Sequence, residues 1–489
     1  MAARFVCVDR QTPLLLPPDL RDWLPEDHLA HFILEAVNAL PLAGARVNER
    51  GSGSAQYPPR MLLAVLVYCY ATGLFSSRQI ERATYTDVAV RFLAGDTHPD
   101  HDTLCAFRRG NGLLLKNSFV EVLKLAREMK VLKVGRIAVD GTKILASASK
   151  HAAVSYQRAG EKIKELEAEV AELLEKAERA DATPLDDGLT LPGEVARRRD
   201  RIEKLKAARA ALEERARARA EAERADHEAE KTAREANRQH GERTGGETGP
   251  SKDWKNASRK LPVIGKSEGD PRDEREREPP PPSPQPKPAD QYNFTDPQSR
   301  IMKAGNGAHF EQAYNAQAAV DTDSRLIVAQ RVTNAANDKE QLIPTVAALP
   351  ADVAADLTAV LADSGFASQK AIEQIERDGR IRVYAAVEKT SHHRRVSDLE
   401  RRDDPPPPPP EAGVLERMRH RLRTKAGRAI YRLRQQTVEP VFGIIKEAMG
   451  FRRFQLRGEE KAALEWTLVT LAYNLRRLHR MRAAAAAAA

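Results

Sequence analysis

The sequence predicts a mixed α/β domain that follows an all-helical N-terminal region and is interrupted by a long helical insertion. Three observations support this class. Short apolar runs typical of strands occur at residues 131–149 and again after residue 291, where helical segments separate the later ones. Residues 155–240 are rich in Glu, Lys, Arg and Ala and have heptad spacing. Residues 1–130 contain short helical segments joined by tight turns.

These shifts in composition divide the 489 residues into five parts. The predicted parts are a helical N-terminal domain (1–130), an α/β domain in two pieces (131–154 and 291–482), a coiled-coil insert (155–240), a disordered linker (241–290) and a low-complexity tail (483–489). The linker is assigned as disordered because it has no periodicity and carries alternating charges with Pro279–Pro282.

The N-terminal region begins with an amphipathic helix at Glu26–Ala39, and the next helix, Met61–Tyr70, is apolar nearly all round and is expected to be buried. Gly73 ends that helix. Further helices are predicted near Gln79–Arg82, over Thr86–Leu93, and from His101 onward with Asp102 or Thr103 as the cap. The last helix carries Arg108 and Arg109, which suits a helix-turn-helix-like DNA binder, although a helical dimerisation domain is an open alternative.

The insertion is predicted to be an antiparallel helical hairpin. Apolar residues fall at heptad core positions in two runs, Ile163, Leu166, Val170 and Leu173, then Ile202, Leu205 and Leu212. Between the runs, Thr183–Gly193 contains prolines and glycines that a helix cannot continue through. A hairpin returns its two ends close together, so such an insertion can leave the surrounding fold intact.

The α/β domain is predicted from the order of its elements. Strands are expected at Arg136–Val139, with Gly141 turning the chain away, and then at Ser299–Met302, Phe310–Val320, Leu326–Val332, Leu357–Ala362 and Ile381–Val387. Helices are expected at Lys339–Ala348, Ser368–Asp378 and within Leu415–Arg482. This order is similar to that of ribonuclease H.

Charge and composition restrict the partners. The net charge is +9 and the pI is near 9.3, which favours a nucleic acid partner first and an acidic membrane surface second. The three cysteines, Cys7, Cys69 and Cys105, form no CxxC pair and give no zinc knuckle or disulfide framework. Without a signal segment or an apolar stretch long enough to cross a bilayer, a cytoplasmic protein with no membrane partner is expected.

Three carboxylates from distant segments are the candidate catalytic residues. Asp140 and Asp363 each follow a short apolar run, and Glu439 belongs to a predicted helix. If the strands before the two aspartates are parallel neighbours, both acids emerge at the same edge of the sheet, where Glu439 can join them. Three such acids can hold two Mg²⁺ ions and support phosphodiester chemistry, and Mn²⁺ can substitute for Mg²⁺.

Several islands in one order then resemble the DDE transposases of bacterial insertion sequences. The matching stretches are His101–Arg109, Ala138–Lys143, Asn293–Arg300, Gln312–Gln317, Ala362–Phe366, Val438–Lys446 and Gly450–Phe454. The resemblance implies a helical transposase domain followed by a ribonuclease-H-like catalytic domain. It further implies that Asp140, Asp363 and Glu439 bind metal, that the enzyme cleaves and joins double-stranded DNA at transposon ends, and that it works as a homo-oligomer, at least a dimer.

The resemblance also assigns DNA contacts. Lys446 is implied to contact the DNA backbone, and Tyr431 and Arg434 correspond to the Tyr and Arg that precede the third acid, with one extra residue between Arg434 and Glu439. Basic side chains expected at the DNA surface are Arg108, Arg109, Arg452 and Arg453.

Alternatives stay open at this point. Glu447 can replace Glu439 as the third acid, and Asp338 and Asp296 are either outer contributors to the site or structural turn residues. A non-catalytic DNA-binding or architectural protein derived from a decayed transposase is the main functional alternative, and a ribonuclease or resolvase is a third.

Overall fold

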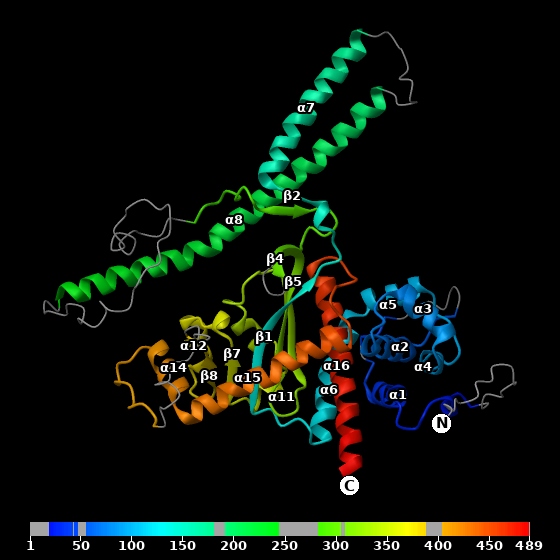
Figure 1. The fold of residues 1–489 in the computed structure, drawn as a ribbon, viewed down its shortest axis with the longest axis vertical. Helices are drawn as coiled ribbons and strands as arrows, with labels where there is room; N and C mark the ends of the chain where they lie inside the picture. Colours follow the sequence, from blue (N-terminus) through cyan, green and yellow to red (C-terminus); the bar gives the residue numbers. More distant parts are fainter. Residues whose placement is uncertain are drawn as a thin grey trace, which may run out of the picture. The chain divides into compact units, whose positions relative to one another are not determined.

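The computed structural model describes residues 19–42, 44–46, 55–179, 191–243, 282–304, 309–387 and 403–488 (Figure 1). The chain divides into two compact units, one formed by residues 1–152 and 295–489 and the other by residues 153–294. Residues 244–281 of the segment predicted to be disordered lie outside the described residues.

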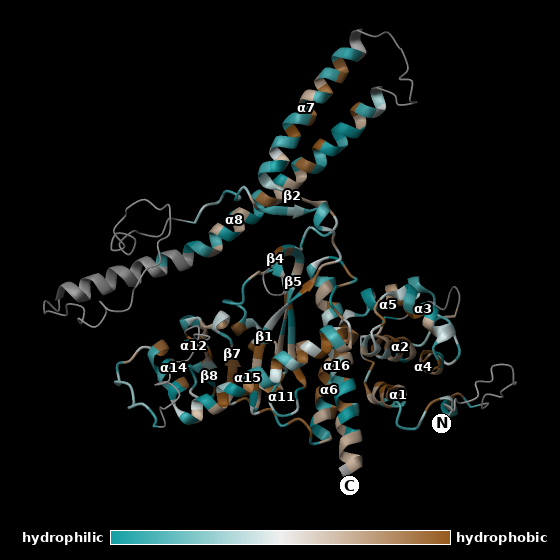
Figure 2. Cartoon of the chain, in the orientation of Figure 1, coloured by the Kyte–Doolittle hydropathy of each residue, from teal (hydrophilic) through white to brown (hydrophobic). Residues whose placement is uncertain are grey.

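The first unit begins with short helices. Their bounds are η1 (Leu20–Trp23), α1 (Leu29–Ala39), α2 (Pro59–Thr72), α3 (Ser77–Thr86), α4 (Val88–Leu93), α5 (His101–Gly110) and α6 (Gly112–Glu128). Helix α2 is buried from Leu62 to Ala71, as its all-round apolar pattern predicts (Figure 2), and Gly73 ends it in a left-handed conformation with φ of 95°.

Several helix boundaries in this region differ from the prediction, and α1, for example, begins at Leu29 rather than at Glu26. The helix expected at Thr86–Leu93 starts only at Val88, because the Asp87 side chain accepts a hydrogen bond from the Val90 N–H and caps α4. Helix α5 is capped by Asp100, whose carboxylate accepts from the Thr103 N–H at 2.6 Å. The prediction of Asp102 or Thr103 as the cap was therefore wrong by two or three residues.

A mixed six-stranded sheet forms the centre of the first unit. Its strands are β1 (Arg136–Leu145), β4 (Arg300–Ala304), β5 (His309–Asp321), β6 (Ile327–Thr333), β7 (Ala359–Ala362) and β8 (Arg382–Ala385). The order is β4-β5-β1-β7-β8, with β6 also paired to β5. Strands β1 and β7 are parallel neighbours, with Ile137 opposite Val360, which confirms the arrangement expected for the strands before Asp140 and Asp363.

Strand β1 continues past the turn predicted at Gly141. It pairs with β5 as far as Leu145, and Gly141 lies opposite Gln317. A Cβ atom at Gly141 would lie 2.3 Å from the Gln317 Nε2 atom and 2.6 Å from the Asp338 Oδ1 atom. The prediction of a turn was wrong because this glycine admits close-packed side chains rather than a change of chain direction.

Helices that follow the strands complete the first unit. They are α10 (Leu342–Ala347), α11 (Ala351–Ala355), η4 (Ser364–Phe366), α12 (Gln369–Glu376), α14 (Val414–Arg423), α15 (Lys425–Gly443), the π-helical turn η5 (Ile444–Ala448) and α16 (Glu459–Ala488).

Helix α16 joins the sheet to the N-terminal helices, since it packs against β6, α6 and α2 (Figure 1). On the sheet side, the Trp466 indole N–H donates to the Gln317 carbonyl at 3.1 Å, and the Asn474 amide exchanges two hydrogen bonds with the Ile327 backbone. The sheet and the N-terminal helices therefore share one hydrophobic core.

The second unit consists of β2 (Ala153–Ser155), α7 (Tyr156–Arg179), α8 (Leu191–Arg243) and β3 (Gln291–Asn293), with η2 (Lys150–Ala152) just before it. Helices α7 and α8 run antiparallel, since Glu167 pairs with Lys206 and Glu169 with Arg198. Their contact buries Ile163, Leu166, Val170, Val195, Ile202 and Leu205. Strands β2 and β3 pair, with Ser155 opposite Gln291, so the two ends of the insertion lie side by side.

Over the ranges given above, no single helix is both long and apolar enough to cross a membrane.

Candidate active site

The three predicted acids come from three elements of the first unit. Asp140 lies within β1, where its Oδ1 atom accepts from the Gly141 N–H at 2.8 Å. Asp363 directly follows β7, and its Oδ1 atom accepts from the Ser364 N–H at 2.7 Å, which caps η4. Glu439 lies in α15, immediately before Pro440. Local hydrogen bonds thus fix the two aspartates directly after the segment over which β1 and β7 pair, Arg136–Val139 with Ala359–Ala362.

One guanidinium group brings the three acids together. The Arg434 Nη1 atom lies 3.3 Å from the Asp140 Oδ2 atom, and the Nη2 atom lies 3.9 Å from Asp363 Oδ1 and 3.5 Å from Glu439 Oε1. Its side chain is only 9% exposed, and its Cζ atom lies 6.0 Å from the centre of the Tyr431 ring. Acids that lie 76 to 299 residues apart in the sequence therefore converge on one cation.

Exposure differs among the three carboxylates. The Asp140 side chain is 21% exposed, whereas Asp363 and Glu439 are 48% and 56% exposed. Burial raises the pKa of Asp140 to about 6, against the lowering effects of the Gly141 N–H and Arg434, and the neighbouring Asp363 and Asp338 raise it further. Asp140 forms the floor of the site, and the other two acids form its open side.

The acids suit a divalent cation by charge and by ligand type. Carboxylate oxygens are the ligands that Mg²⁺ and Mn²⁺ prefer, and here three of them already share one positive group. Among the described residues, no group of three or more His, Cys, Asp or Glu side chains has the arrangement of a metal centre. The Arg434 guanidinium lies where the three acids meet, so a cation that binds all three would have to replace it.

Lys446 is partly withdrawn from solvent. It belongs to the π-helical turn η5, a local feature that is common at functional sites. Burial lowers its pKa, and the nearby cations Arg452 and Lys143 lower it further. Burial also raises the pKa of Tyr431.

The arginines predicted at the DNA surface lie in different environments. Arg109, Arg452 and Arg453 are exposed, and Arg452 pairs with Glu447. Glu447, the alternative third acid, is thus held by a different arginine from the one that joins the triad. Arg108 is buried, with its side chain 4% exposed.

The surface position predicted for Arg108 is wrong, because its charge is used inside the fold. Its guanidinium donates to the Tyr70 hydroxyl at 2.5 Å and to the Phe75 carbonyl at 3.0 Å, and it lies 3.7 Å from the fully buried carboxylate of Glu465. Helical periodicity alone could not show that this arginine faces α16.

A second polar group lies next to Asp140, and it includes Asp338, for which the sequence permits either an outer role at the site or a structural one. The Asp338 Oδ1 atom accepts from the Asn315 and Gln317 side-chain amides at 2.6 Å each, and its Oδ2 atom lies 3.6 Å from the Lys143 Nζ atom. The available signal was the alternation of Asn315 and Gln317 along an otherwise apolar strand. Asp296, in contrast, is fully buried and accepts from the Tyr314 hydroxyl and the Gly458 N–H.

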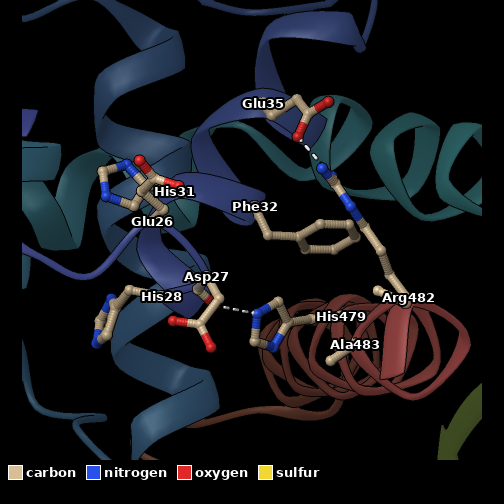
Figure 3. A pocket seen from close by; sticks show the side chains of 10 residues that line it. Glu26, Asp27, His28, His31, Phe32, Glu35, His479, Arg482 and Ala483 are labelled. Atoms are coloured by element: carbon tan, nitrogen blue, oxygen red, sulfur yellow. Dashed lines mark hydrogen bonds and ion pairs between the residues drawn. The ribbon is translucent and has the colours of Figure 1, made fainter. Parts of the chain in front are cut away.

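A pocket of about 280 Å³ lies elsewhere, between α1 and the end of α16 (Figure 3). In it, the Arg482 guanidinium pairs with Glu35 at 2.8 Å, and the His479 ring contacts the Asp27 carbonyl at 2.7 Å. None of the predicted catalytic acids lines this pocket, so its lining gives no support to the phosphodiester chemistry considered above.

Comparison with known families adds two matches. Residues 282–475 match the family model described as "Transposase DDE domain", and residues 18–110 match the one described as "Transposase domain (DUF772)". No curated protein and no solved structure matches the chain. The first match includes Asp363 and Glu439, whereas Asp140 precedes it, on the other side of the insertion.

Proposed function

The chain belongs to the DDE-type transposases of insertion sequences, and we propose that it binds the ends of its mobile element, cleaves the DNA there and joins the freed ends to target DNA. The observation that carries this proposal is the shared contact of Asp140, Asp363 and Glu439 with Arg434. DNA is the substrate of this family, and the net charge of +9 suits it.

In this proposal the three acids hold two Mg²⁺ ions, for which Mn²⁺ can substitute. Bound there, the cations would lower the pKa of an attacking water or 3′-hydroxyl and neutralise charge on the leaving oxygen. Hydrolysis breaks the bond between phosphorus and the 3′-oxygen and leaves a 3′-hydroxyl. Strand transfer then forms a bond from that hydroxyl to a target phosphate and expels the target's own 3′-oxygen.

The chain's side chains position the DNA. Lys446, Arg453 and Arg109 offer cations to the phosphate backbone, and the buried Arg434 and the half-buried Tyr431 lie beside the acids to which a strand end would be brought. Residues 1–130 are proposed to recognise the element's ends or to dimerise. Because two ends must be held together, the working form is proposed to be at least a dimer.

The proposal is tested by a cleavage assay on a plasmid that contains the mobile element encoding this protein, together with the DNA that flanks it. The wild-type protein with Mg²⁺ should cut at both ends of the element, whereas Asp363→Ala and Glu439→Ala should bind these ends without cutting them. Glu447→Ala is the matched control, since that acid pairs with Arg452, and it should cut normally.

Two outcomes would overturn the proposal. Full cleavage by Asp363→Ala would show that the assignment of the catalytic acids is wrong. Binding without any cleavage by the wild-type protein, with Mg²⁺ or Mn²⁺, would instead identify a non-catalytic DNA-binding protein.

A further inference from the structure

A polar group beside Asp140 consists of Lys143, Asn315, Gln317 and Asp338. Some of its buried donor and acceptor atoms have no hydrogen-bond partner within the group. Lys143 extends from β1 directly opposite Asn315, and Asn315 and Gln317 both point to Asp338. Asn315 and Gln317 are fully buried, and Lys143 and Asp338 are only 23% and 22% exposed. Gly141 makes this packing possible, because a Cβ atom there would clash with three of the group's polar atoms.

The Lys143 ammonium is the least satisfied member of the group. Its Nζ atom is buried without a hydrogen-bond partner, and its nearest anion is the Asp338 oxygen at 3.6 Å. The side-chain oxygens of Asn315 and Gln317 also lack partners. A buried ammonium whose donors are unused is costly, so its position calls for a ligand that brings acceptor oxygens and negative charge.

The location of Lys143 indicates which ligand this is. The charges of Asp140 and Asp338 both act on Lys143, and Lys143 acts in turn on Lys446. Lys143, three residues after Asp140 on β1, is therefore within electrostatic range of both the acid at the floor of the site and the lysine assigned to the DNA backbone. A phosphodiester seated against Asp140 would place a non-bridging oxygen within reach of this ammonium.

We propose that Lys143 binds a non-bridging oxygen of the scissile phosphate, and that Asp338, oriented by Asn315 and Gln317, is the positioning residue that holds Lys143 there. The proposal rests on the function proposed above, because it needs DNA in the site. Negative charge on the non-bridging oxygens is what a fixed ammonium stabilises during phosphoryl transfer.

The competing explanation is that Lys143 only neutralises Asp338. The double variant Lys143→Met/Asp338→Asn separates the two, because it removes the ion pair and leaves the net charge unchanged. Lys133→Met is the matched control, since Lys133 is exposed and precedes the other end of β1. Thermal unfolding of each variant shows whether its fold is intact.

Cleavage of the element's ends gives the first readout. Lys143→Met should lose about 10²–10³-fold in cleavage rate, as expected for the loss of one preorganised donor. The double variant should unfold at the wild-type temperature and remain equally deficient, whereas Lys133→Met should cut normally. Wild-type cleavage by the double variant would overturn the proposal.

Binding without divalent cations gives a second readout that does not depend on catalysis. End duplexes with a normal or an uncharged methylphosphonate linkage at the scissile position are compared in EDTA. Wild-type protein should prefer the charged linkage, Lys143→Met should bind the two equally, and Asp338→Asn should show a reduced preference. An unchanged preference in Lys143→Met would contradict the proposal.

The same experiments distinguish failure of the proposed function from failure of the role proposed for Lys143 and Asp338. If the wild-type protein neither binds nor cuts the element's ends, the proposed function itself fails. If the wild-type protein cuts and the double variant cuts equally well, only the role of Lys143 and Asp338 fails.

Discussion

Asp140 is the residue at which function and stability conflict most clearly. Its folded-state pKa of about 6 lies above the ordinary value of 3.8, so folding favours the protonated form. The contribution of this group to the free energy of unfolding is therefore fully present below about pH 4 and is lost as the pH rises to about 6. Above that pH, Asp140 is ionised in the folded protein, and its burial then lowers the free energy of unfolding.

Asp140→Asn should consequently stabilise the protein in EDTA at pH 7. The expected gain in the free energy of unfolding is about 1–3 kcal/mol, since one pKa unit corresponds to about 1.4 kcal/mol. Urea unfolding at pH 7 and pH 4 measures it, and the gain should vanish at pH 4. A loss of stability at pH 7 would show that Asp140 is stabilising in its ionised form.

Arg434 has the opposite effect, because it neutralises three acids at once. Arg434→Gln should lower the free energy of unfolding in EDTA by about 1–3 kcal/mol, a value reduced from that of a fully buried pair because two of the acids are half exposed. Adding Mn²⁺ should raise the unfolding temperature of Arg434→Gln more than that of the wild type, since the cation then replaces the missing charge.

Arg432→Gln, an exposed neighbour on the same helix, is the control and should respond to Mn²⁺ as the wild type does. An equal Mn²⁺ response in Arg434→Gln and the wild type would mean that the guanidinium and the cation do not share a site.

At the scale of elements, α5 carries two adjacent arginines in different environments, since Arg108 is buried and Arg109 is exposed. Arg108→Met leaves the carboxylate of Glu465 buried without its cation, so the free energy of unfolding should fall by about 3–5 kcal/mol. Arg109→Met should change it by less than about 0.5 kcal/mol and reduce only the salt dependence of DNA binding. If Arg108→Met were as stable as the wild type but bound DNA more weakly, Arg108 would be shown to contact DNA.

The elements also show what the sequence could predict. Strand patterns in the sequence predicted all six strands of the central sheet, and the clearest case is Ala359–Ala362, because a strand buried on both faces must be apolar. The pattern misjudged Gly141, since a glycine required for close packing and a glycine required for a turn look the same in a sequence. Arg108 was misplaced for a related reason: its partner Glu465 is 357 residues away.

The convergence of the site was predictable only in part. Parallel neighbouring strands bring Asp140 and Asp363 to one edge, which follows from topology. The contact between Arg434 and all three acids depends on how α15 lies against β1, and Asp338 belongs to a loop whose position periodicity does not specify. The extra residue between Arg434 and Glu439 does not separate them, because the long arginine side chain still reaches the carboxylate at 3.5 Å.

At the scale of the whole molecule, the insertion is a separable unit. Its ends meet in the paired strands β2 and β3, so a short turn that joins Ser155 to Gln291 needs to span only the distance between neighbouring strands. Replacing residues 156–290 with such a turn should leave the rest of the chain folded, with an unfolding temperature close to that of the full protein. Loss of cooperative unfolding would show that the larger unit depends on the insertion.

The proposed activity requires that three distant carboxylates, those of Asp140, Asp363 and Glu439, bind one set of cations. Fe²⁺ substituted for Mg²⁺ generates hydroxyl radicals with ascorbate and peroxide, and these radicals cut the polypeptide next to the bound ion. We expect cuts near all three acids, Asp140, Asp363 and Glu439; added Mg²⁺ should suppress these cuts, and Asp363→Ala should abolish them. Cuts near only one of the three acids, or cuts unaffected by Asp363→Ala, would contradict this proposal.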